Sequence, residues 1–217
     1  MTVRRALLDH LAARLDARSA APVLRVAIDG VDGAGKTTFA DELAAVLRER
    51  GRTVIRASVD GFHAPRAVRY RLGRASPEGF YRDSYDLPAL ERELLDPFAP
   101  GGHGVHRAHV FDARTDLPDV AEQMQAAPGT VLVVDGIFLH RPELRGRWSW
   151  SSWLEVDRAT SLQRCVARDG SGSPDPADPV NRRYVEGQRL YMLEARPQEV
   201  ATHVVDNDDL TVPVLLR

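Results

Sequence analysis

The sequence predicts an α/β fold with three layers, in which helices cover both faces of a mostly parallel central sheet of about five strands. Short apolar runs alternate along the chain with segments whose apolar residues recur at helical spacing. Alternating strands and helices are typical of a parallel sheet. The 217 residues suit one domain with its own core and a small lid, so we expect residues 1–217 to form a single unit.

Five apolar runs are expected to form the strands, at residues 23–28, 53–59, 130–136, 151–156 and 202–207. The run TVLVVDG at 130–136 is the clearest candidate for a central strand. An open parallel sheet binds its ligands beyond the carboxyl ends of its strands. The residues that follow these runs are therefore the first place to look for a functional site.

Helices are expected between the strands. Residues 1–20 carry leucines at helical spacing among arginines and aspartates, which predicts an amphipathic helix. A second helix follows a glycine-rich stretch and stops at Gly51. Residues 87–95 predict a short helix closed by Pro97, and the Gly- and Pro-rich segment 169–179 predicts a flexible loop.

The composition excludes several classes of protein. The chain has 29 Lys and Arg against 31 Asp and Glu, so a broad surface for nucleic acid or membrane is not expected. The single cysteine, Cys165, rules out a disulfide within the chain and argues against a cysteine zinc site. The N-terminus has no secretory signal pattern, and no run of about 18 apolar residues is present. We expect a cytoplasmic protein.

The strongest motif is DGVDGAGKTT at 29–38, which contains G-x-x-x-x-G-K-T from Gly30 to Thr37. Its glycines let the backbone wrap around a phosphate, and the helix that follows adds its positive end. Lys36 is expected to reach the β- and γ-phosphates of a nucleotide, and the Thr37 hydroxyl to bind Mg²⁺. The predicted nucleotide-binding residues are Gly30, Asp32, Gly33, Ala34, Gly35, Lys36, Thr37 and Thr38. The alternative, a chance glycine-rich turn, fits poorly with a strand before the motif and a helix after it.

A second acidic group for the metal is expected at Asp135, which ends the run VLVVD. A carboxylate at the end of a central strand can hold Mg²⁺ directly or through water. The alternative is an ordinary turn residue after a strand. Together with the P-loop and its Thr37, Asp135 favours the metal role.

Three classes of protein share the P-loop. A GTPase switch is disfavoured, because the Gly of D-x-x-G is missing after Asp135 and no N-K-x-D is present. A mechanical ATPase usually needs further domains. A small-molecule kinase needs a base, an acceptor pocket and a lid with arginines. Asp60, after the second predicted strand, is the candidate base that would take the proton of the acceptor hydroxyl, although Asp-Gly is also a common turn.

The lid is expected within residues 158–190. Arg164 and Arg168 are the candidates to stabilise charge on the transferred phosphoryl group, whereas most other arginines of this region are expected to be solvated. Cys165 lies on the apolar face of the same predicted helix and is expected to belong to the core rather than to catalysis.

The order of GVDGAGKT, SVDGFH, SPEGFYRDSYDLPAL, VLVVDGIFL and RCVARD resembles the uridine kinase and phosphoribulokinase family of P-loop kinases, over about residues 23–207. The resemblance implies Asp60 as catalytic base, Mg²⁺-ATP as donor and an arginine-bearing lid. It also implies acceptor-binding segments within 61–118, where we name Phe62, Tyr81 and Phe111. Dimers and tetramers occur in the family, so a homo-oligomer is an open alternative.

The chain departs from uridine kinases at several positions. Phe111 stands where they carry a pyrimidine-binding Tyr, Asp116 lies near the position of their His, and Asp135 replaces a Glu. A small-molecule acceptor is therefore expected, with a nucleoside as the first candidate and pantothenate or a sugar as alternatives. The competing class is a non-catalytic ATP-binding regulator, in which Asp60 would be dispensable.

Overall fold

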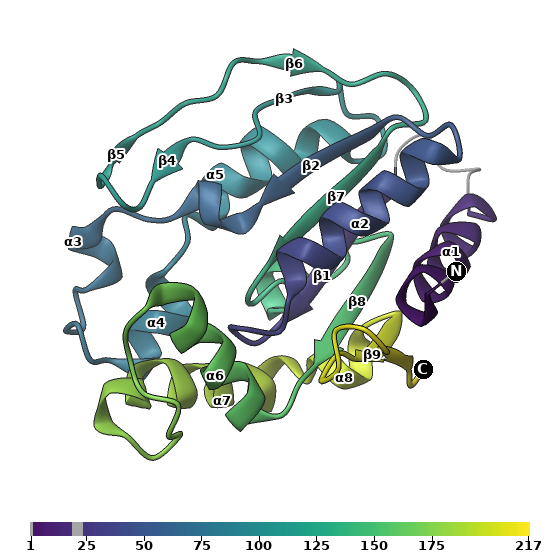
Figure 1. The fold of residues 1–217 in the computed structure, drawn as a ribbon. Helices are drawn as coiled ribbons and strands as arrows, with labels where there is room; N and C mark the ends of the chain where they lie inside the picture. The colour runs from purple at the N-terminus through teal and green to yellow at the C-terminus, as the bar shows by residue number, and fades with distance from the viewer. Residues whose placement is uncertain (1, 19–23) are drawn as a thin grey trace.

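The computed structural model describes residues 2–18 and 24–217. Met1 and residues 19–23 lie outside the described residues. They include both ends of the helix expected at 1–20 and the first residue of the strand expected at 23–28. The described part has a six-stranded sheet in the order β10-β9-β8-β1-β7-β2 (Figure 1). Its strands are β1 Leu24–Gly30, β2 Val54–Ser58, β7 Val131–Gly136, β8 Trp150–Glu155, β9 His203–Asp206 and β10 Val214–Leu215.

The mostly parallel sheet confirms the predicted fold class, with one strand more than expected. β1 pairs in parallel with both β7 and β8, which places the start of the P-loop at the centre of the sheet. β2 and β9 extend the parallel sheet on either side. The added strand, β10, runs antiparallel to β9 at the edge. Two residues are too few to show a strand period in the sequence.

Two helices cover one face of the sheet. α1 (Val3–Asp16) and α2 (Lys36–Glu49) pack on Leu24, Val26 and Ile28 of β1 in one apolar cluster. Gly51, with φ 83°, follows α2 in the left-handed conformation expected of a helix stop. Figure 1 shows α2 lying along the sheet with α1 beside it.

The opposite face is covered by segments from later in the chain. Ala27 of β1 and Leu132 and Val134 of β7 face a second apolar cluster. Its helical members are α4 (Pro77–Asp83), α5 (Leu87–Leu90), a π-helical turn η2 (Glu91–Leu95) and α7 (Arg182–Ala195). The single helix expected at 87–95 is therefore an α-helical turn that continues as a π-helical one.

Short elements complete the chain. They are η1 (Val59–Phe62), α3 (Arg66–Arg69), η3 (Asp96–Phe98), η4 (Pro142–Leu144), α6 (Arg158–Asp169), η5 (Pro179–Asn181) and α8 (Pro197–Val200). Two small antiparallel pairs lie outside the main sheet: β3 (Val105–His106) with β6 (Met124–Gln125), and β4 (Phe111–Asp112) with β5 (Leu117–Pro118). In residues 2–18 and 24–217, no helix has both the length and the apolar character needed to cross a membrane.

Candidate active site

The P-loop joins the carboxyl end of β1 to the start of α2. Gly33 and Gly35 adopt φ values of 71° and 83°, which side chains other than glycine rarely adopt. A Cβ on Gly33 would also lie 2.3 Å from the carbonyl oxygen of Ser161 on α6, so this turn packs directly on the helix. Lys36 Nζ donates a hydrogen bond to the carbonyl of Val31 at 2.8 Å, at the mouth of the loop.

The two predicted metal-binding residues are neighbours. The Thr37 hydroxyl donates to Oδ2 of Asp135 at 2.7 Å. The other oxygen of Asp135 accepts from Nη2 of Arg56 at 2.8 Å. Arg56 comes from β2 and was not predicted from the sequence. Asp135 is buried at 2% exposure, so Arg56 supplies the counter-charge that a buried carboxylate needs.

The donors around Thr37 suit a hard cation such as Mg²⁺. A hydroxyl and a carboxylate oxygen are the ligand types that Mg²⁺ prefers. No group of three or more His, Cys, Asp or Glu side chains that could hold a metal ion is found in the described part of the chain. A site with one or two protein ligands matches the way Mg²⁺ binds together with the phosphates of a nucleotide rather than in a protein cage.

Asp60 lies in η1, directly after β2, and its carboxylate is exposed. Oδ1 accepts a hydrogen bond from the Tyr85 hydroxyl at 2.9 Å. Burial, with the negative charge of Asp60 as a further cause, raises the pKa of Tyr85 well above its ordinary value, so the phenol stays a donor. The ring of His63 lies 4.7 Å from that of Tyr85, and its Nδ1 is 2.8 Å from the carbonyl oxygen of Asp60.

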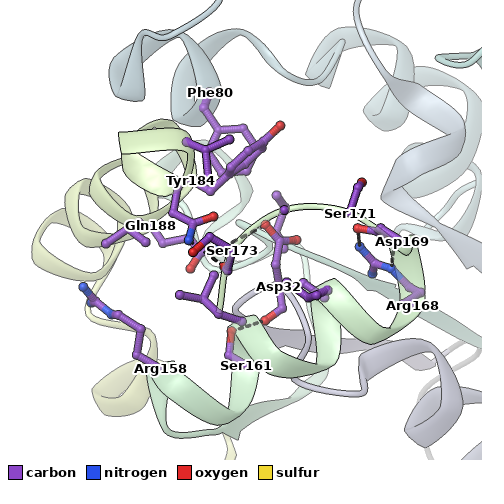
Figure 2. Close-up of a pocket in the computed structure, with 18 of the residues that line it drawn as sticks. Asp32, Phe80, Arg158, Ser161, Arg168, Asp169, Ser171, Ser173, Tyr184 and Gln188 are labelled. Carbon is purple, nitrogen blue, oxygen red and sulfur yellow. Dashed lines mark hydrogen bonds and ion pairs between the residues drawn. The ribbon is translucent and has the colours of Figure 1, made fainter. Parts of the chain in front are cut away.

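A pocket of about 740 Å³ opens between the P-loop, the Asp60 turn and the region of α6 and α7. Asp32 of the P-loop and Asp60 both line it. Figure 2 shows Asp32 near its centre, with Phe80 and Tyr184 together on one side. Of the predicted nucleotide-binding residues, the pocket therefore brings Asp32 to one cavity with the predicted base.

Asp32 is held from both helices. Its backbone carbonyl accepts from the Ser161 hydroxyl of α6 at 2.6 Å, and its carboxylate accepts from Nε2 of Gln188 on α7 at 2.9 Å (Figure 2). Burial raises the pKa of Asp32. The positive charge of Lys36 lowers this pKa in part, and the negative charge of Asp60 raises it. The P-loop is thus tied to both helices of the predicted lid region.

The two predicted lid arginines lie in different places. Arg168 lines the pocket and makes a two-pronged ion pair with Asp169, at 2.7 and 2.9 Å (Figure 2). Arg164 does not line it. Its guanidinium donates to the carbonyls of Asn207 and Asp208, which fixes the segment after β9 beside the P-loop. Its Nη1 is also 3.4 Å from the carbonyl oxygen of Gly33 in the P-loop, so Arg164 braces this loop here, and its contact with the phosphoryl group stays a prediction. Arg158, at the start of the same helix, lines the pocket.

The three aromatic residues predicted to contact the acceptor do not line the pocket. Phe62 and Tyr81 are fully buried in the apolar cluster under α4 and α7. Tyr81 packs on Phe138 and Tyr191, with ring centroids 5.1 and 5.6 Å apart. Phe111 is half-buried in β4. The residue before it, Val110, donates its backbone N–H to the carbonyl of Gly61 at 2.9 Å, which places β4 beside the Asp60 turn. The rings of Phe62 and Tyr81 fill the core in this structure, which does not favour a contact with the acceptor, and that contact stays a prediction.

A buried polar network lies beneath the P-loop. Asp29, at the end of β1, is fully buried and accepts from the Tyr191 hydroxyl of α7. His140 approaches the same carboxylate, Nδ1 to Oδ2 at 2.7 Å. The network joins the central strand, the loop after β7 and the long helix α7. The sequence offered no signal for it, since the three residues are far apart along the chain.

Comparisons with known proteins were consistent with this geometry. No protein-family model matches the chain. Thymidylate kinase of Xanthomonas campestris pv. campestris (strain B100) is 29% identical over 150 residues, which are 67% of this chain. The match covers 61% of the length of that relative, and the other curated relatives found are thymidylate kinases of the same species with the same coverage.

Solved structures match over nearly the whole chain. A Bacillus stearothermophilus protein described as a possible uridine kinase has a TM-score of 0.71 and 24% identity, with 92% of this chain and 97% of that chain covered. A Silicibacter sp. TM1040 protein, described as a candidate fructose transport system kinase, has a TM-score of 0.67, 25% identity and coverages of 90% and 96%. Phosphoribulokinase from Rhodobacter spheroides has a TM-score of 0.58, 14% identity and coverages of 86% and 71%. The chain has the fold of the uridine kinase and phosphoribulokinase family.

Proposed function

We propose that this protein is a kinase that transfers the γ-phosphoryl group of ATP to a hydroxyl of a small metabolite. The observation that carries the proposal is the shared pocket, lined by Asp32 of the P-loop and by Asp60. A hydrolase switch has no need of a second substrate cavity with a carboxylate at its wall. The likeness to several kinases of the same fold supports the same reading.

In this mechanism, residues of the chain bind the phosphates of ATP, orient the transferred group and take the proton of the acceptor hydroxyl. The P-loop amides and Lys36 hold the phosphates, and Arg168 reaches the transferred group after leaving Asp169. Asp60 accepts the proton of the attacking hydroxyl while the bond from the γ-phosphorus to the β–γ bridging oxygen breaks and ADP leaves. Thr37 and Asp135 would hold Mg²⁺, which supplies charge neutralisation on the phosphates when it is bound.

The proposal also concerns the chemical class of the acceptor. A nucleoside is the first candidate, by likeness to the protein described as a uridine kinase. Pantothenate and sugars are the alternatives, because Phe111 and Asp116 replace the residues that hold a pyrimidine in uridine kinases. We expect ADP release from Mg²⁺-ATP to depend on one member of a panel of uridine, cytidine, pantothenate and several sugars.

Asp60→Asn separates a kinase from an ATP-binding regulator. Loss of a general base should lower acceptor-dependent ADP release by about a hundredfold or more. Binding of ATP should persist, and it has a direct readout, because Lys36 is the only lysine in the sequence. Mg²⁺-ATP should protect Lys36 from an amine-reactive acetylating reagent in both proteins, as followed by peptide mass spectrometry. Unchanged turnover in Asp60→Asn, with protection intact, would exclude the proposed mechanism.

A further inference from the structure

Three arginine side chains surround one aromatic ring next to the pocket. The guanidinium carbons of Arg69, Arg74 and Arg183 lie 5.6, 5.1 and 4.9 Å from the ring centroid of Tyr70. They come from α3, from the loop after it and from the start of α7. Arg183 also lies 5.5 Å from the ring centroid of Phe80, which lines the pocket. We call these three residues the arginine cluster.

The arginine cluster lacks matching negative charge. Within residues 2–18 and 24–217, the only carboxylate paired with it is Asp116, which accepts from Arg69 at 3.1 Å. Arg74 and Arg183 form no ion pair with a described residue. Arg183 donates one hydrogen bond, from Nη1 to the carbonyl of Arg74 at 2.7 Å, so its Nε and Nη2 have no partner among those residues.

Arg183 is largely buried, at 9% exposure, but its Nε and Nη2 are not among the buried side-chain nitrogens that lack a partner, so these two nitrogens are open to solvent or to a ligand. Burial lowers the pKa of its guanidinium, and the charges of Arg69 and Arg74 lower it further. A buried cation is normally paired with an anion or fully hydrogen-bonded. The rings of Tyr70 and Phe80 attract the cation through their faces, but they leave its free N–H groups unused. A planar guanidinium whose Nε and Nη2 are both free can donate two parallel hydrogen bonds to a phosphate or a carboxylate.

We propose that the phosphoryl acceptor carries a phosphate or carboxylate group, and that Arg74 and Arg183 bind this group beside the Phe80 and Tyr184 wall of the pocket. The inference rests on the proposed kinase function and narrows its acceptor. An anionic sugar or an acid with a free hydroxyl fits this requirement, whereas a neutral nucleoside leaves the two arginines unpaired. Arg69 is a supporting member, since Asp116 already neutralises it.

The first test compares acceptors that differ only in the anionic group. Ribose 5-phosphate is measured against ribose, and glycerate against glycerol, with the wild type, Arg74→Gln, Arg183→Gln and Arg92→Gln. Arg92 is an exposed control with the same change of charge, paired with Glu93 and outside the pocket lining. Arg74 is exposed, so its replacement leaves the core intact even where Arg183→Gln folds poorly.

We expect the wild type to use the anionic member of at least one pair, and kcat/KM for it to fall about tenfold or more in Arg74→Gln and Arg183→Gln. Arg92→Gln and the protection of Lys36 by Mg²⁺-ATP should not change. Equal use of the neutral member, or an equal loss for both members in the variants, would overturn the inference while leaving the kinase function in place.

The second test does not depend on turnover. With the P-loop filled by Mg²⁺-ADP, millimolar inorganic phosphate should raise the melting temperature of the wild type and of Arg92→Gln, but not that of Arg74→Gln. No shift in the wild type, or the same shift in Arg74→Gln, would show that the arginine cluster is not an anion site. If phosphate binds as expected but no acceptor at all is phosphorylated, the proposed kinase function is what fails.

Discussion

The hydroxyl of Tyr85 lies 2.9 Å from Oδ1 of Asp60 and donates a hydrogen bond to it. Tyr85 is buried, and its ring packs against His63, so the donor is fixed in place. An exposed carboxylate on a turn would otherwise sample several rotamers. We infer that Tyr85 is a positioning residue for the predicted base, a role that the sequence alone did not indicate.

Tyr85→Phe tests this relationship. Loss of a hydrogen bond to a charged group should lower kcat by about tenfold, since such a bond contributes about 1.5–3 kcal/mol. The affinity for ATP should not change, because the Tyr85 hydroxyl donates to Asp60 and forms no hydrogen bond with a P-loop residue in the described part of the chain. Steady-state kinetics with the acceptor in excess gives kcat, and protection of Lys36 reports ATP binding. A fall in melting temperature with unchanged kcat would make the role of Tyr85 purely structural.

Tyr81 was predicted to contact the acceptor but lies in the core, and its substitution tests that predicted contact. Its hydroxyl is buried without a hydrogen-bond partner among residues 2–18 and 24–217, and burial raises its pKa to about 12. Tyr81→Phe removes an unsatisfied polar group and keeps the ring that packs on Phe138 and Tyr191. We expect an equal or higher melting temperature and an unchanged KM for the acceptor. A several-fold rise in KM would support the contact between Tyr81 and the acceptor that the sequence predicts.

The fold could be predicted because its signals are local. The apolar runs of β1, β2, β7, β8 and β9, the P-loop motif and the glycine after α2 are each contained within a few neighbouring residues. β10 escaped because it has two residues and depends on pairing with β9. The change from α5 to η2 has no Gly or Pro within residues 89–95 to announce it in the sequence.

The site could be predicted only in part, because side-chain direction depends on contacts that are distant in sequence. Thr37 and Asp135 meet as expected, since Thr37 follows β1 and Asp135 lies near the carboxyl end of the neighbouring parallel strand β7. Arg164 and Arg168 are one helical turn apart, yet Arg164 is held by carbonyls at 207 and 208, which reach it only through the return of β9. Tyr81 and Tyr85 differ similarly: one belongs to α4 and fills the core, and the other follows the end of that helix and faces Asp60.

We predict that the stability of the protein depends on Mg²⁺ when Arg56 is replaced. Its guanidinium bonds Asp135 at 2.8 Å and Asp41 at 2.9 Å, and only the first partner is buried. Arg56→Gln leaves Asp135 without its counter-charge, so we expect a loss of about 3 kcal/mol in the free energy of unfolding. Mg²⁺ with ADP should recover part of this loss, because a divalent cation near Thr37 replaces the missing positive charge.

Thermal unfolding with and without Mg²⁺-ADP measures this effect. The rise in melting temperature on adding Mg²⁺-ADP should be larger for Arg56→Gln than for the wild type. Arg48→Gln is the matched control, since Arg48 donates to the carbonyl of Val54 and to no carboxylate in the described residues. An equal rise in all three proteins would mean that Mg²⁺ does not interact with the charge of Asp135. The predicted role of Asp135 in the Mg²⁺ site would then be wrong.

His203 makes stability depend on pH. It is buried in β9 against the ring of Trp150 at 5.2 Å, and Nη1 of Arg14 lies 3.4 Å from its Nε2. Burial, with the charge of Arg14 as a second cause, lowers the pKa of His203 below its ordinary 6.5. The unfolded chain binds a proton near pH 6.5, whereas the folded protein binds it only at lower pH. Acidification through this window therefore favours the unfolded chain, and the stability is fully present above pH 6.5.

Urea unfolding of the wild type and of His203→Gln, from about pH 7.5 to about pH 5.5, isolates this contribution. Carboxylates titrate in both proteins, so only the difference between them is attributed to His203. We expect the wild type to lose more free energy of unfolding than His203→Gln, by up to about 1.4 kcal/mol for each unit by which the pKa is lowered. Parallel curves for the wild type and His203→Gln would show that His203 is protonated equally easily in the folded and unfolded protein.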